Sequence, residues 1–154
     1  MTYYPDGSAY AYALPFVISS VTNVGWLSAL SPDFPKGSVS DDFKEALRWA
    51  CCALSTNQMR GFHVCELCER DAPSIECKGA VSSRRILGSS EIWIESGDKI
   101  FAAPDLIFHY VTNHSYCPPK DFIEAVVAAF RLRKVDESLY DRIVDQAFLS
   151  RNAP

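Results

Sequence analysis

A histidine and two cysteines lie within six consecutive residues, at His63, Cys65 and Cys68. Two further histidines, His109 and His114, follow much later, with four residues between them. Thiolates and imidazoles are donors that zinc prefers in proteins, and both local spacings occur in Cys2His2 sites. The sequence therefore predicts a zinc site formed by Cys65, Cys68, His109 and His114, with a long insertion between its two halves.

The exact ligand set is open at this stage. His63 is a reserve ligand, because side chains alternate along a strand and a short strand over 61–65 would place it on the same face as Cys65. Cys77 is an isolated further candidate. Four protein ligands would fill a tetrahedral coordination sphere, which favours a structural ion over a catalytic one. The alternative is that the histidines are hydrogen-bonded core residues and the cysteines are buried thiols.

The same residues also allow thiol chemistry. Cys65 could act as a nucleophile with one of the three histidines as its base, and Glu66 or Glu91 could orient the imidazole. A thioredoxin-type role would require the cysteine pair to begin a helix after a buried strand, and the surrounding pattern does not supply one. The sequence contains no phosphate loop, nucleophile elbow or zinc-protease helix motif. A regulator that senses metal or oxidation through Cys65 and Cys68 is a third interpretation.

The length and composition are those of one globular domain spanning residues 1–154. A chain of 154 residues can bury roughly two thirds of its unfolded surface, so a metal ion would act as a local crosslink. The amino terminus lacks a secretory pattern, and no apolar run is long enough to cross a bilayer. These features predict a cytoplasmic protein with reduced cysteines, in which Cys51 and Cys52 are small buried residues. The even count of six cysteines leaves disulfide bonding as the alternative.

The charge balance limits the classes of partner. The net charge is −4 and the isoelectric point is about 5.3, whereas nucleic-acid binding requires a basic surface. The basic cluster at 131–134 ends an expected helix, where cations complement the helix dipole. The sequence therefore favours a basic protein partner over nucleic acid or a membrane.

The pattern of apolar residues predicts an α+β fold, a small mixed domain with a β-hairpin, a Cys-x2-Cys knuckle and C-terminal helices. Ser40 is a suitable N-cap for the first helix, and Pro104 suits the first turn of the second. Residues 69–83 are polar and irregular, and a tail helix over about 136–150 is a candidate appended element. The expected elements are strands over 16–21 and 61–65, a hairpin over 92–101, and helices over about 41–55, 103–113, 120–134 and 137–150.

Several short sequence segments resemble those of a family of small bacterial proteins. That family is known by its sequence pattern and not by an activity. The segments are Thr2-Tyr3-Tyr4, Asn23-Val24-Gly25-Trp26-Leu27, residues 61–68 and 88–92, residues 102–110, and His114-Ser115-Tyr116-Cys117-Pro118-Pro119. The resemblance implies that His63 and the four expected ligands belong to the family pattern. It also implies that the remaining cysteines, at 51, 52, 77 and 117, are particular to this chain. The segment after about Val135 lies outside the pattern.

These features favour a small protein-binding domain stabilised by a structural zinc. An immunity protein that occludes a basic toxin or enzyme fits the size and the acidic balance. The alternatives are the thiol-dependent or metal-dependent enzyme and the redox or metal sensor described above.

Overall fold

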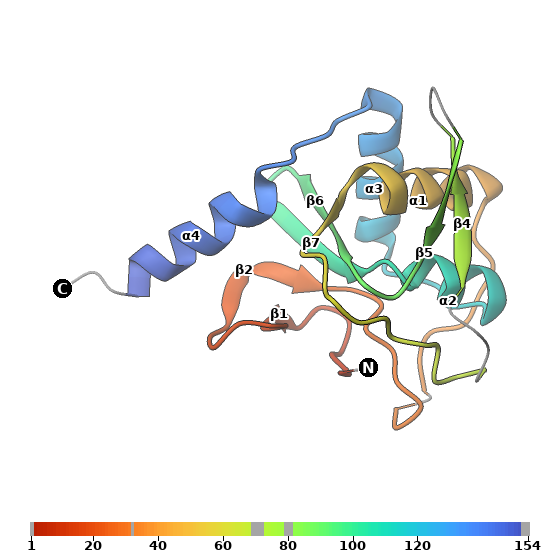
Figure 1. Ribbon diagram of the computed structural model, residues 1–154, viewed down its shortest axis with the longest axis horizontal. Coiled ribbons are helices and arrows are strands. Elements are labelled where there is room, and N and C mark those ends of the chain that lie inside the picture. The colour runs from red at the N-terminus through yellow and green to blue at the C-terminus, as the bar shows by residue number, and fades with distance from the viewer. Residues whose placement is uncertain (1, 32, 69–72, 79–81, 152–154) are drawn as a thin grey trace.

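A mixed five-stranded sheet forms the centre of the fold (Figure 1). The computed structural model describes residues 2–31, 33–68, 73–78 and 82–151. In spatial order the strands are β1 (Ala9–Tyr10), β2 (Ile18–Asn23), β7 (Lys99–Pro104), β6 (Glu91–Ser96) and β3 (Ser55–Thr56). β2 and β7 are parallel, and the other neighbouring pairs are antiparallel. The predicted α+β class is confirmed.

The two faces of this sheet pack into separate cores, because successive side chains of a strand point in opposite directions. On one face, Ile92, Ile94 and Phe101 pack with α1 (Asp41–Ala53), α2 (Ile107–Asn113) and α3 (Lys120–Leu132). On the other face, Trp93 and Ala102 pack with the aromatic N-terminal segment and with α4 (Leu139–Arg151). The β6–β7 hairpin is therefore apolar on both faces.

The first helix begins where its capping residue predicts. The hydroxyl of Ser40 accepts a hydrogen bond from the backbone N–H of Phe43 at 3.2 Å, and two aspartates occupy the first turn. Capping by serine and negative charge near the N-terminus both stabilise a helix start. The buried residues of α1 follow helical spacing, at Phe43, Ala46, Leu47, Ala50 and Cys51.

The expected helix over 103–113 begins too early, and Pro104 is not in its first turn. Ala102 and Ala103 instead pair with Trp93 and Ile92 in the antiparallel ladder, and β7 continues to Pro104. Helix preference is a weak determinant that sheet pairing overrides. α2 accordingly begins only at Ile107.

Two further predictions around the cysteine segment are wrong. Residues 61–65 do not form a strand and are irregular. Within the span expected to be irregular, β4 (Ser74–Cys77) pairs with β5 (Ser83–Ile86) as a separate two-stranded sheet. The rest of that span, at 69–72 and 79–81, lies outside the described residues.

The tail helix is anchored at its beginning and projects from the body of the molecule (Figure 1). Leu139 and Ile143 are buried in the core that contains Trp93, whereas Phe148 and Leu149 are exposed. Within the described part of the chain, no helix is both long enough and apolar enough to cross a membrane.

Candidate metal centre

Four side chains from two distant segments converge on one point. The ligand atoms of Cys65, Cys68, His109 and His114 all lie within 4.8 Å of one another. The Nε2 atoms of the two histidines are 3.2 Å apart. Cys65 Sγ lies 3.3 Å from His114 Nε2, and Cys68 Sγ lies 3.4 Å from His109 Nε2. The structure thus brings together the four residues that the sequence singled out, in a group that could hold a metal ion.

The end of α2 directs both imidazoles to the same place. On a regular helix, residues five positions apart point in directions that differ by about 140°. His114 is instead the C-cap residue, with φ −117° and ψ 5°, and its backbone N–H bonds to Tyr110 O at 3.1 Å. The chain then turns at Ser115, whose φ is +56°. This departure from helical geometry turns His114 back toward His109, which the pair spacing anticipates.

Contacts from two other loops hold the cysteine segment. The backbone N–H of His63 donates to Gly88 O at 2.7 Å. The carboxylate of Glu66 accepts from Ser28 Oγ at 2.8 Å and from the backbone N–H of Ala29 at 3.2 Å. These bonds position Cys65 and the turn at 66–68, which carries Cys68.

The thiol of Cys65 lies in an environment that favours its neutral form. Cys65 is 1% exposed, and burial raises the pKa of its thiol, with the neighbouring Cys68 thiol adding to the rise. A nucleophilic cysteine requires a lowered pKa and access to solvent. The metal-free environment of Cys65 therefore disfavours a catalytic thiol, whereas a bound cation would favour the thiolate.

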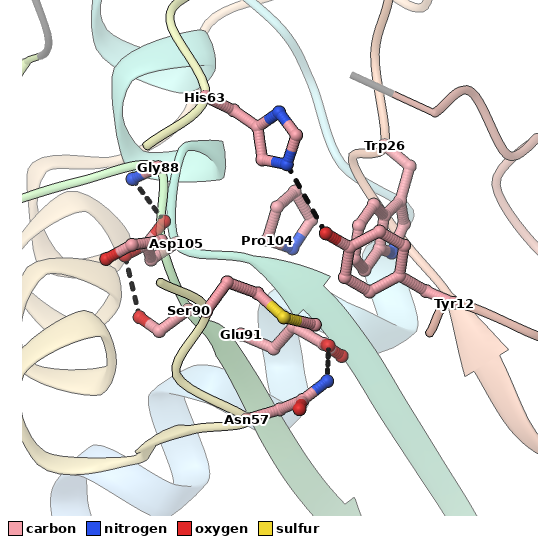
Figure 2. A pocket seen from close by; sticks show the side chains of 11 residues that line it. Tyr12, Trp26, Asn57, His63, Gly88, Ser90, Glu91, Pro104 and Asp105 are labelled. Atoms are coloured by element: carbon pink, nitrogen blue, oxygen red, sulfur yellow. Dashed lines mark hydrogen bonds between the residues drawn. The ribbon is translucent and has the colours of Figure 1, made fainter. Parts of the chain in front are cut away.

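His63 lies outside this cluster. Its Nε2 is 3.4 Å from the hydroxyl of Tyr12, and its ring lines a different pocket (Figure 2). Burial lowers the pKa of its imidazole. The reserve role assigned to His63 rested on strand alternation, which fails because residues 61–65 form no strand.

Cys77 is not a spare ligand, because it forms a disulfide with Cys52. The predictions that Cys52 is a buried thiol and that all six cysteines are reduced are therefore also wrong in this structure. Packing of β4 against α1 brings the two Cα atoms to 5.7 Å. The two cysteines are 25 positions apart, and nothing in the sequence around either one indicates that they pair. Cys51 is fully buried, as predicted.

A second polar feature, which we call the Glu91 pocket, lies beside the irregular segment. Its lining includes Tyr12, Trp26, Asn57, His63, Glu91 and Asp105 (Figure 2). Glu91 accepts hydrogen bonds from Tyr10, Asn57 and Trp93, and these three donors are not the imidazole that the thiol-enzyme alternative offered for Glu66 or Glu91. Burial raises its pKa to about 7. An acidic residue directly before the apolar run at 92–94 is the sequence signal that could have found this site.

The fold and the side-chain cluster define a class of protein, an α+β domain with a Cys2His2 group that could hold a metal ion. The chain belongs to the family described as "Domain of unknown function (DUF7919)", whose pattern matches residues 2–127. The match contains all four clustered residues and ends within α3, so α4 lies beyond it. Neither the curated proteins nor the solved structures contain a match to this chain. Membership of a family of unknown function is thus confirmed. The individual sequence motifs assigned to the family, and its bacterial origin, stay predictions.

Proposed function

We propose that Cys65, Cys68, His109 and His114 bind one structural zinc ion. Zinc forms bonds of about 2.3 Å to sulfur and about 2.0–2.1 Å to nitrogen, so donor atoms at the corners of a regular tetrahedron lie roughly 3.3 to 3.8 Å apart. Three of the six separations between donor atoms, at 3.2, 3.3 and 3.4 Å, are close to these edges, and all four donor atoms lie within 4.8 Å of one another. This convergence of two thiols and two imidazoles is the observation that carries the proposal.

The ion would fasten an irregular segment to a helix. Cys65 and Cys68 lie in a stretch without helix or strand, whereas His109 lies within α2 and His114 caps it. Four protein ligands close the coordination sphere, which is typical of structural zinc. Binding would require both thiols to lose their protons, so zinc affinity should rise with pH. Binding would also stabilise the fold, because the unfolded chain does not bring the four ligands together.

We further propose that the domain acts by binding a basic protein. The net charge of −4 supports a partner of opposite charge. An immunity-type protein that occludes a basic toxin or enzyme in the bacterial cytoplasm fits these features. The Cys52–Cys77 disulfide is the observation against that compartment, because disulfides are rare in the cytosol. Alkylation of free thiols in intact cells, followed by mass spectrometry, tests the compartment directly.

Native mass spectrometry tests the metal proposal. The expected result is one zinc ion per chain, lost on treatment with a chelator together with a fall in the unfolding temperature. Cys68→Ser should abolish the bound ion. Cys117→Ser is the matched control, because Cys117 is also a half-buried free thiol but lies outside the cluster. A metal-free wild-type chain with the same unfolding temperature in zinc and in chelator contradicts the proposal.

The partner proposal has its own test. Crosslinking in cells that express the protein identifies a candidate, and the purified pair is then titrated at increasing salt. We expect tight binding to a basic protein that weakens as salt screens the charges. If no purified candidate binds, while a small-molecule screen finds turnover that Cys65→Ser abolishes, the thiol-enzyme alternative replaces this proposal.

A further inference from the structure

The Glu91 pocket contains a buried carboxylate without a cation. Glu91 is 1% exposed, and its oxygens accept from Tyr10 Oη and Trp93 Nε1, each at 3.0 Å, and from the amide of Asn57. All three donors are neutral. Within the described part of the chain, no lysine or arginine forms a salt bridge with this carboxylate. A buried negative charge without a positive partner is costly, so a cation that entered the pocket would gain a strong interaction.

The other walls of the pocket also favour positive charge. The rings of Tyr12 and Trp26 lie with centroids 4.5 Å apart on one side. Aromatic faces attract ammonium groups, most strongly where water is excluded. Asp105 is a second buried carboxylate on the opposite side, held by the backbone N–H of Gly88 at 2.6 Å and by Ser90 Oγ at 2.7 Å (Figure 2). The guanidinium of Arg85, which donates to the same Ser90 Oγ at 3.0 Å, partly offsets the charge of Asp105, so Glu91 is the stronger site for a cation.

The size of the cavity selects among cations. Its volume is about 10 Å³, close to the smallest volume that holds one ordered water molecule. An ammonium group is nearly the size of water, whereas a guanidinium or a quaternary ammonium is several times larger. The cavity therefore has room for a primary ammonium and not for the larger cations.

We propose that the Glu91 pocket binds a primary ammonium group, with the Glu91 carboxylate as its counter-ion and the Tyr12 and Trp26 rings as its walls. The ammonium could belong to a small free amine or to a lysine side chain of a protein, and the two sources present the same chemistry. This inference goes beyond the proposed zinc site and does not depend on it, because the pocket uses none of the four clustered residues.

Three tryptophans provide the readout. Trp93 Nε1 donates directly to Glu91 Oε2 at 3.0 Å, and Trp26 lines the pocket. Trp49 packs against Phe130 in the core on the other face and serves as an internal control. The full chain is titrated with methylammonium chloride while the indole N–H signals are followed by NMR. We expect saturable shifts of the Trp93 and Trp26 signals, no shift of Trp49, and no response to tetramethylammonium chloride or sodium chloride at equal ionic strength.

Substitutions test the counter-ion. Glu91→Gln removes the charge with little change in shape, and we expect at least a tenfold loss of methylammonium affinity. Glu95→Gln is the matched control, because Glu95 lies on the same strand but pairs with Lys134 at the surface. Wild-type affinity in Glu91→Gln overturns the proposal, as does an equal response of the wild type to tetramethylammonium.

The wild type alone provides a test that does not rely on any variant folding. Glu91 is faced by Tyr10 of β1, Asn57 after β3, Trp93 of β6, Asp105 after β7 and Tyr140 of α4. Tyr4 and Tyr12 of the N-terminal segment also face it, and His63, whose pKa is lowered by burial, lines the same pocket. With a pKa of about 7, Glu91 is mostly protonated at pH 6 and mostly ionised at pH 8, so methylammonium should bind about tenfold more weakly at pH 6. An unchanged or stronger affinity at pH 6 contradicts the assignment of Glu91 as the counter-ion.

The source of the ammonium is distinguished by a second ligand, Nα-acetyl-lysine methylamide, with its Nε-acetylated form as the neutral control. Binding of the lysine derivative, but not of the acetylated one, supports a protein lysine as the occupant. Binding of methylammonium alone supports a small free amine. Zinc content is measured in the same samples, so failure of this proposal and failure of the zinc proposal give different results.

Discussion

The backbones of His63 and Gly88 are in direct contact. The N–H of His63 donates to Gly88 O at 2.7 Å, and Gly88 has a φ of +102°. A Cβ placed on Gly88 would lie 2.2 Å from the carbonyl oxygen of His63. Only glycine allows this approach, because the obstacle is backbone that no rotamer change can move. The contact sets the path of the chain two residues before Cys65 and thereby links the Glu91 pocket to the metal centre.

Gly88→Ala should therefore destabilise the protein and weaken metal binding together. A positive φ alone costs a residue with a side chain about 1 kcal/mol, and the clash with His63 should add about 1–3 kcal/mol more. The measurement is urea unfolding, with zinc affinity measured in parallel. Gly97→Ala is the control, because Gly97 has a φ of +63° but no atom within 4 Å of the added methyl. Equal losses in the two variants would mean that the close approach contributes nothing.

Substitution of single histidines should show which of them bind zinc and which only lie near the site. His109→Ala should lower zinc affinity by more than about 100-fold, because changes outside the ligands alone cost 10 to 100-fold. His63→Ala should keep one zinc per chain, because His63 contacts Tyr12 and lies outside the cluster. Competition with a zinc chelator measures both. If His63→Ala lost its zinc, His63 would be a ligand, and the ligand set of Cys65, Cys68, His109 and His114 would be contradicted.

Local chemistry explains which features were predictable. The N-cap at Ser40 and the Gly97-Asp98 hairpin turn are encoded within a few residues, and both occur as expected. The four clustered residues were also identified from local spacing, because each half of the site is a short motif. The sequence could not show that a gap of some forty residues closes, since that requires α2 and the irregular segment to pack together.

The features that were missed depend on contacts between distant segments. Glu91 bonds to Tyr10, 81 positions away, and to Asn57, 34 positions away. The pairing of Cys52 with Cys77 follows from packing of β4 on α1. The predicted strand over 61–65 is wrong for the same reason, because the N–H of His63 bonds to Gly88 O in a distant loop rather than to a sheet. Periodicity carries no information about such contacts.

The disulfide yields a prediction that separates it from the metal centre. Cys52→Ser should lower the free energy of unfolding by about 3 kcal/mol, because the crosslink closes a loop of about 26 residues, the two cysteines being 25 positions apart. The variant should still bind one zinc, since neither cysteine of the pair is in the cluster. Urea unfolding in non-reducing buffer and native mass spectrometry measure the two effects, with Cys117→Ser as the control for loss of a thiol. Loss of zinc in Cys52→Ser would mean that the metal centre depends on the disulfide.

Glu91 should make the stability of the protein depend on pH between about 4.5 and 7. Burial raises the pKa of this carboxyl to about 7 in the folded state, against 4.5 for an ordinary glutamate. The folded chain therefore holds a proton that the unfolded chain has released. The stabilisation is fully present below about pH 4.5 and is lost as the pH rises through 7, a total of about 3 kcal/mol.

Other groups titrate over the same range, so the test compares variants rather than absolute values. The free energies of unfolding of the wild type and Glu91→Gln are measured in urea at pH 5, 6, 7 and 8. The glutamine carries no proton to release, so the wild type should lose about 3 kcal/mol relative to the variant as the pH rises. Glu95→Gln is the control: it keeps Glu91, so its stability should follow that of the wild type across this pH range. A difference between wild type and Glu91→Gln that is constant with pH would mean that Glu91 is ionised throughout, held so by its three neutral donors.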